Sequence, residues 1–337
     1  MPAPYNTNTT TTELVTDYAS LIKGKVILTT GVSPGSLGGA FVQSIAKANP
    51  ACLILAGRNL PKLDGCVRDI KAENPSVKVI TVQVDLGSLA SVRNAAETIN
   101  GNAGIPAIDV LVNNAGIMAV DYALSDEGVE SQFATNHLGP FLFTNLIMGK
   151  VLKSESPRIV MVSSDGHRLS PIRFDDYNFD GGKTYNKWVA YGQSKTANML
   201  MALALASKLG PKYGLLAFSL HPGVINTNLG NHLDFDVDVS LQSIDRQLGN
   251  REGWSTFNWK SLERGAATHV YAAFDPALKD HNGAYLIDSH IADPLIDTVK
   301  SWAVSSFEAE RLWKLSEQLV GQEFAVRSIG ICSTHNP

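Results

Sequence analysis

Two side chains that could move a proton together lie four residues apart, Tyr191 and Lys195. On a helix this spacing places both on the same face. A free phenol has a pKa of about 10, and a neighbouring ammonium group favours the phenolate, so we expect Lys195 to lower the pKa of Tyr191. The pair would then exchange a proton with a substrate oxygen near neutral pH. The spacing alone is common in helices, so its meaning depends on the motifs that accompany it.

A glycine-rich turn is the first of these motifs. Residues 30–39 read TGVSPGSLGG and directly follow a β-branched run at 26–30. Glycines at a strand-to-helix turn let the backbone approach a pyrophosphate, and the N-terminus of a helix adds free N–H groups and a partial positive charge. The turn predicts a dinucleotide site. The predicted contacts here are Gly31, Ser33, Gly35, Ser36, Leu37 and Gly38.

The end of the second predicted strand indicates which dinucleotide is bound. Enzymes that use NAD place an acidic residue there for the ribose hydroxyls, whereas the 2′-phosphate of NADP calls for an arginine. Residues 56–59 read AGRN, with no acid and with Arg58 suited to a bidentate phosphate contact. We therefore predict NADP(H); the alternative is that Arg58 is an ordinary surface arginine.

Short apolar strands alternate with helices along most of the chain. This alternation predicts an α/β protein with a single doubly wound (Rossmann) domain and a central seven-stranded parallel sheet, which binds ligands at the carboxyl ends of its strands. Two long helices are expected over 127–152 and 190–209. The seven strands are predicted at 26–30, 52–56, 77–84, 109–112, 158–163, 215–220 and 284–287.

The domain is predicted to span residues 23–324. Residues 1–22 begin with a Thr-, Asn- and Pro-rich stretch and are expected to form a disordered arm, and residues 325–337 a C-terminal tail. An insertion at 229–262 is longer than an ordinary loop and contains aromatic residues that are costly to expose, so it is predicted to be a lid over the substrate. The alternative is a solvated surface loop. Its aromatic residues are Phe235, Trp254, Phe257 and Trp259.

Composition excludes several classes of protein. The net charge of -4 gives no reason to expect nucleic acid or an anionic membrane surface as a partner. No stretch approaches the roughly 20 apolar residues of a membrane span. The three cysteines lack the spacing of a zinc site or a disulfide framework. We expect a soluble, cytoplasmic protein without a metal.

Further motifs follow the predicted strands in a specific order. They are VDL at 84–86, NNAG at 113–116, NHLG at 136–139, VSS at 162–164, YGQSK at 191–195 and HPGVINT at 221–227. With the glycine-rich turn, this order resembles the short-chain dehydrogenase/reductase family from about Lys25 to Phe324, and most of all its retinol-dehydrogenase-like branch. The resemblance also implies a homodimer that associates through the two long helices.

The resemblance implies a catalytic tetrad of Asn136, Ser164, Tyr191 and Lys195. Ser164 would polarise the substrate carbonyl, Lys195 would also bind the nicotinamide ribose, and Asn136 would hold a water that links Lys195 to solvent. Ser163 competes with Ser164 for its role, and the family pattern favours the second serine of the pair.

The resemblance implies further cofactor contacts after the third, fourth and sixth strands. They are Asp85 and Leu86 at the adenine, Asn113, Ala115 and Gly116 at the floor, and Pro222, Gly223, Ile225 and Thr227 at the nicotinamide and pyrophosphate. The glycine-rich turn has one residue more than the usual spacing, so either Gly35 or Ser36 takes the place of the middle glycine.

Together these features predict an NADP(H)-dependent oxidoreductase that interconverts a ketone or aldehyde and an alcohol on a bulky apolar small molecule, of the kind found in secondary metabolism. One alternative is a catalytically silent NADP(H)-binding scaffold or sensor, although such a module needs no proton donor. Another is a lyase, an epimerase or an imine-reducing enzyme that uses the same tetrad.

Overall fold

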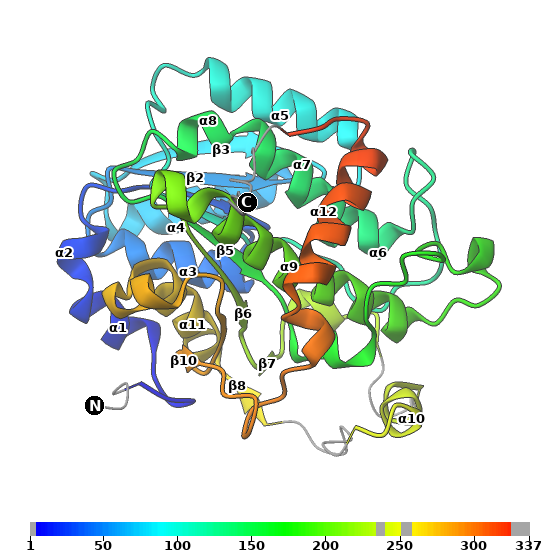
Figure 1. The fold of residues 1–337 in the computed structure, drawn as a ribbon. Coiled ribbons are helices and arrows are strands. Elements are labelled where there is room, and N and C mark those ends of the chain that lie inside the picture. The colour runs from blue at the N-terminus through cyan, green and yellow to red at the C-terminus, as the bar shows by residue number, and fades with distance from the viewer. Residues whose placement is uncertain (1–4, 234–239, 251–257, 325–337) are drawn as a thin grey trace, which may run out of the picture.

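The protein is built around one large, mostly parallel sheet (Figure 1). The structure, a computed structural model, describes residues 5–233, 240–250 and 258–324. The strand order is β10-β9-β6-β5-β4-β1-β2-β3. The strands are β1 Val26–Thr30, β2 Cys52–Gly57, β3 Lys78–Gln83, β4 Val110–Asn113, β5 Arg158–Val162, β6 Leu216–His221, β9 Tyr285–Ile287 and β10 His290–Ile291.

Seven of these strands run parallel, as the sequence predicts, and the eighth does not. β10 pairs antiparallel with β9 through a tight hairpin. The two residues of its turn, Asp288 and Ser289, have φ of 50° and 59°. That conformation is typical of a two-residue hairpin turn, which is usually recognised by a glycine that this turn lacks. The prediction of seven strands therefore misses one strand, β10, at the edge of the sheet.

Helices cover both faces of the sheet, which confirms the doubly wound architecture (Figure 1). Each face has its own apolar core, because a parallel sheet is buried on both sides. One face carries α5 (Leu89–Gly101), α7 (Gly139–Leu146), α9 (Lys187–Tyr213) and α12 (Ser306–Val320). The other carries α1 (Thr11–Asp17), α3 (Leu37–Ala46), α4 (Leu60–Glu73) and α11 (Leu262–Phe274).

The long helix predicted over 127–152 is broken into pieces. Glu130 caps it, because its carboxylate accepts hydrogen bonds from the backbone N–H groups of Gln132 and Phe133 at 2.9 and 2.8 Å. After α6 (Ser131–Phe133) comes the π-helical turn η1 (Ala134–Leu138), then α7 and α8 (Met148–Val151). A π turn widens the helix locally and often lies at a functional site. This one contains Asn136.

The N-terminal residues are ordered where the sequence predicts a disordered arm. α1 and α2 (Ala19–Ile22) pack against the domain, and Leu14 and Ile22 are fully buried. Thr10 and Glu13 form a capping box that starts α1. The prediction is wrong because the threonine-rich stretch hides a T-x-x-E cap followed by apolar residues that the core can bury.

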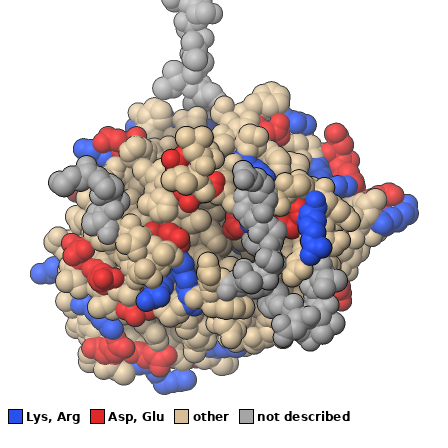
Figure 2. Space-filling model, turned by 90° about the horizontal axis from the view of Figure 1, so that it is seen from below, with Lys and Arg blue, Asp and Glu red and all other residues tan. Residues whose placement is uncertain are grey.

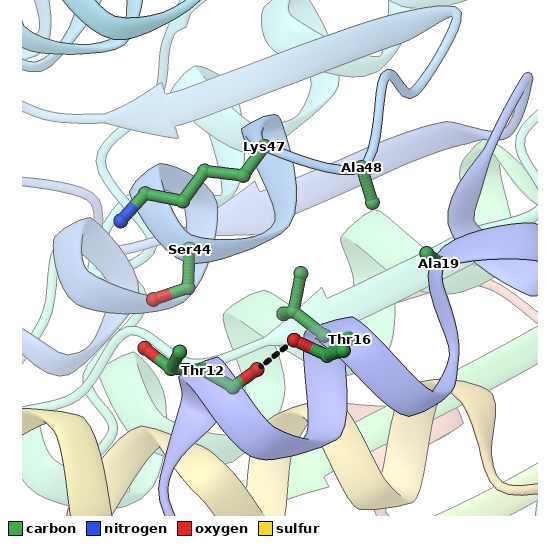
Figure 3. A pocket seen from close by; sticks show the side chains of 7 residues that line it. Thr12, Thr16, Ala19, Ser44, Lys47 and Ala48 are labelled. Atoms are coloured by element: carbon green, nitrogen blue, oxygen red, sulfur yellow. Dashed lines mark hydrogen bonds between the residues drawn. The ribbon is translucent and has the colours of Figure 1, made fainter.

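A small pocket of about 310 Å³ lies between α1 and α3 (Figure 3). Thr12, Thr16, Ser44 and Lys47 line it, and the Thr16 hydroxyl donates to the carbonyl oxygen of Thr12 at 2.8 Å. No residue of the predicted catalytic tetrad is among its lining residues. The pocket therefore marks where the N-terminal helices meet the domain, apart from the site described below.

α12 lies across the C-terminal half of α9, where Lys208 forms an ion pair with Glu310 at 2.6 Å. The chain itself thus covers part of the surface that the predicted homodimer would use, and the dimer stays a prediction. Among the described residues, no helix is long and apolar enough to cross a membrane. The predicted tail at 325–337 lies outside the described residues.

Candidate active site

Tyr191 and Lys195 lie near the start of α9, on the same face of the helix. Asn186 caps this helix by accepting from the N–H groups of Trp188 and Val189. The Lys195 Nζ lies 5.5 Å from the centroid of the Tyr191 ring and donates to the carbonyl oxygen of Val162 at 3.2 Å. Each of the two residues is only 4% exposed. The predicted pair is therefore brought together in a buried setting.

The two serines at the end of β5 have separate contacts. The Ser163 hydroxyl donates to the backbone carbonyl of Lys195 at 2.8 Å, which fastens α9 to the strand. The Ser164 Oγ accepts from the N–H of Gly166 at 3.0 Å, and the same glycine lies against the Tyr191 ring, so Ser164 is near enough to act on the pKa of Tyr191. The second serine, Ser164, is therefore the one that the structure places beside the tyrosine.

Glycine is required two residues after that serine. A Cβ on Gly166 would lie 2.7 Å from Cε1 of Tyr191, closer than side-chain carbons approach. The turn that follows Ser164 can therefore pass the tyrosine ring only without a side chain at this position.

Asn136 is fully buried in the π turn, with its amide held on both sides. Its Oδ1 accepts from the N–H of Ile117 at 2.8 Å, and its Nδ2 donates to the Ile117 carbonyl and to Ser194 Oγ, both at 2.9 Å. A Cβ on Gly116 would lie 3.1 Å from Asn136 Oδ1 and 3.3 Å from Lys195 Nζ. Gly116, Asn136 and Lys195 thus meet at one point.

Burial dominates the electrostatics of this group. It raises the pKa of Tyr191 to about 12, and the hydrogen bond with Ser164 acts in the opposite direction. Burial also lowers the pKa of Lys195 to about 8. The expected lowering of the tyrosine pKa by Lys195 stays a prediction: the ammonium donates to the Val162 carbonyl, and desolvation of the phenolate is the largest influence on the Tyr191 pKa.

The glycine-rich turn has the shape of a phosphate cradle. A Cβ on Gly31 would lie 2.6 Å from Ala115 Cα, and one on Gly38 2.8 Å from the Gly31 carbonyl oxygen, so these glycines allow close packing. Gly35 has φ of +73° and open space where a Cβ would be. Ser36 caps α3 by accepting from the N–H of Gly39 at 3.1 Å. Gly35 therefore takes the open position of the middle glycine, and Ser36 the cap.

The turn fits a nicotinamide dinucleotide, since an open backbone loop leads directly into the N-terminus of α3. Leu37, the first residue of α3, meets two other segments: a Cβ on Gly265 would lie 2.9 Å from Leu37 and 2.6 Å from Ile225. Ile225 belongs to β7 (Val224–Ile225), which pairs with β8 (Trp259–Lys260). The predicted contacts after β6 are thus brought next to those of the turn.

A pocket of about 380 Å³ lies where an adenosine group would extend, between β3 and α5. Arg58 and Asp85 line it. The Arg58 carbonyl accepts from Gln83 Nε2 at 3.2 Å, and the Asp85 carboxylate accepts from the N–H of Gly87 at 2.9 Å. Two residues predicted to contact the adenosine half of the cofactor, Arg58 and Asp85, therefore line the same pocket.

Several residues predicted to contact the cofactor form contacts within the protein instead. The Asn113 side chain is 2% exposed and donates to Thr144 Oγ1 at 2.9 Å, which ties β4 to α7. Leu86 is buried in the core beneath the turn. Sequence reasoning missed Asn114, whose Nδ2 donates to the carbonyl oxygens of Thr30 and Gly31 at 2.9 and 3.2 Å. The signal was present as the second Asn of NNAG.

The remaining contacts follow β6. Pro222 comes directly after that strand, and Gly223 has φ of +95° with the Lys260 side chain against it. Thr227 caps the short helix η4 (Asn228–Gly230) by accepting from the N–H of Leu229. These residues lead from the sheet into the insertion.

The insertion places a helix, α10 (Ser240–Gln247), against the cluster that contains Tyr191. Leu241 packs in an apolar cluster with Tyr191 and Trp188, and Ser240 Oγ accepts from Trp188 Nε1 at 3.0 Å. The other members of this cluster are Met118, Ala119, Leu169, Leu233 and Ile244. Leu233, Leu241 and Ile244 of the predicted lid thus form an apolar wall together with the other residues of this cluster. This wall is called the roof below.

The aromatic residues that suggested the lid do not form this wall. Trp259 is 53% exposed, and Phe235, Trp254 and Phe257 lie outside the described residues. β7, β8 and α10 lie together at the lower end of the molecule in Figure 1. Seen from that end, acidic and basic side chains of the described residues are interspersed among uncharged ones (Figure 2).

Known proteins share this fold and these motifs. The family model for short chain dehydrogenases matches residues 25–237. The short-chain dehydrogenase TIC 32 A, chloroplastic, of Brassica napus is 34% identical over 87% of this chain and 88% of its own. Human retinol dehydrogenase 14 is 34% identical over 89% of this chain and 88% of its own. An uncharacterised protein from Mycobacterium paratuberculosis has a solved structure with a TM-score of 0.67 and 29% identity, covering 91% of this chain and 98% of its own.

The family match spans the glycine-rich turn, the catalytic group and the segment after β6. Proteins of this family are oxidoreductases that bind a nicotinamide cofactor, NAD or NADP. The chain therefore belongs to the short-chain dehydrogenase/reductase family and to its retinol-dehydrogenase-like branch.

Proposed function

We propose that the protein is an NADP(H)-dependent oxidoreductase that interconverts a ketone or aldehyde and an alcohol on a bulky apolar molecule. One observation carries this proposal: the Tyr191 side chain is buried, lies beside Ser164 and close to Lys195, and packs in the apolar cluster of the roof. A proton donor in such a setting has no use in a mere binding module, which argues against a silent scaffold.

The residues divide the work of carbonyl reduction among them. A nicotinamide cofactor, when bound, would supply the hydride for the carbonyl carbon. Ser164 donates a hydrogen bond to the carbonyl oxygen and stabilises the charge that develops there. Tyr191 then donates its Oη proton to that oxygen, which completes the alcohol. With a pKa of about 12, Tyr191 is protonated at neutral pH, the form that reduction requires.

Lys195 and Asn136 serve the tyrosine in this proposal. The Lys195 ammonium lies against the Tyr191 ring and near Gly116, where the ribose of the cofactor would lie. Asn136 fixes the backbone of the 115–117 turn through its two bonds to Ile117. Together they hold the cofactor side of the site and offer a route by which Tyr191 regains its proton.

The composition of the roof is evidence for a bulky apolar substrate. Leu241, Trp188 and Leu169 pack with Tyr191 in one apolar cluster, so a substrate that reaches Tyr191 would meet apolar side chains, and burying a hydrocarbon group against them would lower the free energy. The human relative is named for retinol, an alcohol on a largely apolar molecule, which agrees with this class. We therefore infer an apolar carbonyl or alcohol as the substrate.

The direct test follows NADPH absorbance against a panel of bulky apolar ketones and aldehydes. Wild-type protein should consume NADPH, whereas Tyr191→Phe should lose turnover by at least about a hundredfold because general acid catalysis is removed. NADPH binding, measured by the fluorescence of the cofactor, should be the same in both. Full activity in Tyr191→Phe would refute the mechanism and favour a reaction in which the tyrosine transfers no proton.

The cofactor preference has its own test. Arg58→Ala should weaken NADPH binding by about 10- to 100-fold, as expected when a charged hydrogen bond to the 2′-phosphate is lost, and should leave NADH binding unchanged. Lys62→Ala, an exposed cation on the nearby α4, is the matched control and should change neither. Equal loss of NADPH and NADH binding in Arg58→Ala would show that Arg58 does not bind the 2′-phosphate.

A further inference from the structure

We propose that Arg168 is a positioning residue that fixes the roof of the substrate site and so sets its preference for bulky apolar carbonyls. This inference rests on the proposed function, and it assigns a role to a buried charge that the reaction itself does not use. Arg168 lies in η2 (Asp165–Leu169), the short helix that begins directly after Ser164, and it is 1% exposed.

The guanidinium of Arg168 holds two separate elements. Toward the roof it forms a fork with Asp245 of α10: Nε donates to Oδ1 at 3.1 Å and Nη2 to Oδ2 at 2.8 Å. On its other side, Nη1 donates to Asp165 Oδ2 at 2.5 Å. Asp165 directly follows Ser164, and its N–H donates to His221 Nδ1 at 3.1 Å. One side chain therefore joins the serine turn to the roof.

Asp245 is fitted to this role. It is fully buried, although α10 is otherwise a polar helix, and Asn250 Nδ2 donates to its Oδ1 at 2.7 Å. A buried ion pair contributes little net stability, because desolvation of both charges offsets their attraction, and apolar residues would stabilise the same contact as well. The fork instead fixes the orientation of α10 relative to Arg168, since a planar guanidinium meets a carboxylate in a fixed geometry.

The orientation of α10 matters because one of its apolar side chains packs against Tyr191. Leu241 lies one turn before Asp245 on the same helix and packs against Tyr191 and Trp188. When the fork holds Asp245, the apolar side of α10 is set against the catalytic tyrosine. A shift of the helix would alter the space available to the apolar part of a substrate, while Tyr191, Lys195 and Asn136 would keep their own bonds.

Two variants test this step by kinetics. Arg168→Lys keeps the charge but cannot form the fork, and Asp245→Asn removes the charge from the roof. Each should raise the KM for a bulky aldehyde such as decanal by about tenfold, the size of a lost packing contact in an apolar pocket, with kcat little changed. The KM for propanal, which does not reach the roof, should stay the same, as should NADPH binding.

A matched control separates positioning from general stability. Lys208→Met removes another ion pair, in which Lys208 is buried and Glu310 is exposed, at the opposite end of α9. It should lower the melting temperature without changing the ratio of the two KM values. If Arg168→Lys and Asp245→Asn change kcat for decanal and propanal alike, or change nothing, the proposed role of Arg168 is wrong.

A second measurement does not depend on turnover. Arg246, the exposed neighbour of Asp245, is a site for trypsin on α10. Cleavage after Arg246, followed by mass spectrometry, should be faster in Asp245→Asn than in the wild type and in Lys208→Met. Equal cleavage rates would refute the positioning role. If the wild type reduces no carbonyl but this difference is seen, the proposed function fails and the structural link stands.

Discussion

Two regions of the site are held by different kinds of contact: the roof, and the region around the predicted tetrad, called the floor from here on. The floor, which carries the tetrad, is fastened mainly to backbone atoms: Lys195 Nζ to the Val162 carbonyl, the Ser163 hydroxyl to the Lys195 carbonyl, and Asn136 to both backbone groups of Ile117. In the part of the roof that the structure describes, α10 is fastened by bonds between side chains: the fork between Arg168 and Asp245 and the bond between Trp188 and Ser240.

This difference has a consequence for how the two regions tolerate substitution. A backbone partner is present whatever residue stands at its position, so the floor keeps its geometry when neighbouring side chains change. A side-chain partner disappears with one substitution. The chemistry should therefore withstand change around it, whereas the shape of the roof, and with it the choice of substrate, should respond to a few residues.

The largest effect should come from the floor. Ser164→Ala should lower kcat by about 10²- to 10³-fold, because the carbonyl oxygen loses its hydrogen-bond donor in a buried site. Its control is the adjacent Ser163→Ala, which removes only the bond to the Lys195 carbonyl and should cost about 1 kcal/mol in the free energy of unfolding while most activity is kept. Similar losses of kcat in both variants would contradict the assignment of Ser164.

The next effect depends on pH. Burial lowers the pKa of Lys195 to about 8, so the ammonium is present below that pH and is lost above it. Tyr191, with a pKa of about 12, stays protonated throughout this range. The kcat/KM for NADPH, which reports on the free protein, should fall above pH 8 and approach a tenfold loss per pH unit.

The control for this profile is Lys195→Met. It should be slow at every pH, and its residual activity should show no decline near pH 8. A wild-type profile that stays level up to pH 10 would mean that the charge of Lys195 is not needed for cofactor binding or turnover.

The smallest effect should come from the roof. Leu241→Ala removes apolar contact next to Tyr191 and should raise the KM for decanal about fivefold, the equivalent of about 1 kcal/mol. Leu248→Ala, at a residue 47% exposed just after α10, should leave that KM unchanged. An unchanged KM in Leu241→Ala would show that the substrate does not touch the roof, and a fall in kcat would show that the roof acts on the chemistry.

Much of the fold could be predicted from the sequence, because buried parallel strands and their flanking helices carry strong local patterns. The positions of strands β1 to β6 along the chain and the segments that hold the predicted tetrad follow from such patterns. The hairpin to β10 was missed because its two-residue turn contains Asp288 and Ser289 instead of glycine. The helix α1 was missed because Leu14 and Val15 become apolar anchors only when the rest of the domain is there to bury them.

Within the site, the residue types and their spacing along the chain determine which groups can transfer a proton and where a dinucleotide can bind. Only the tertiary structure decides how they act. It places Ser164, and not Ser163, beside Tyr191, raises the pKa of Tyr191 where the spacing suggested a fall, and brings Asp245 to Arg168 from 77 residues away. The reason is that a spacing is a local property, whereas burial and the partner of a charge depend on every element packed around it.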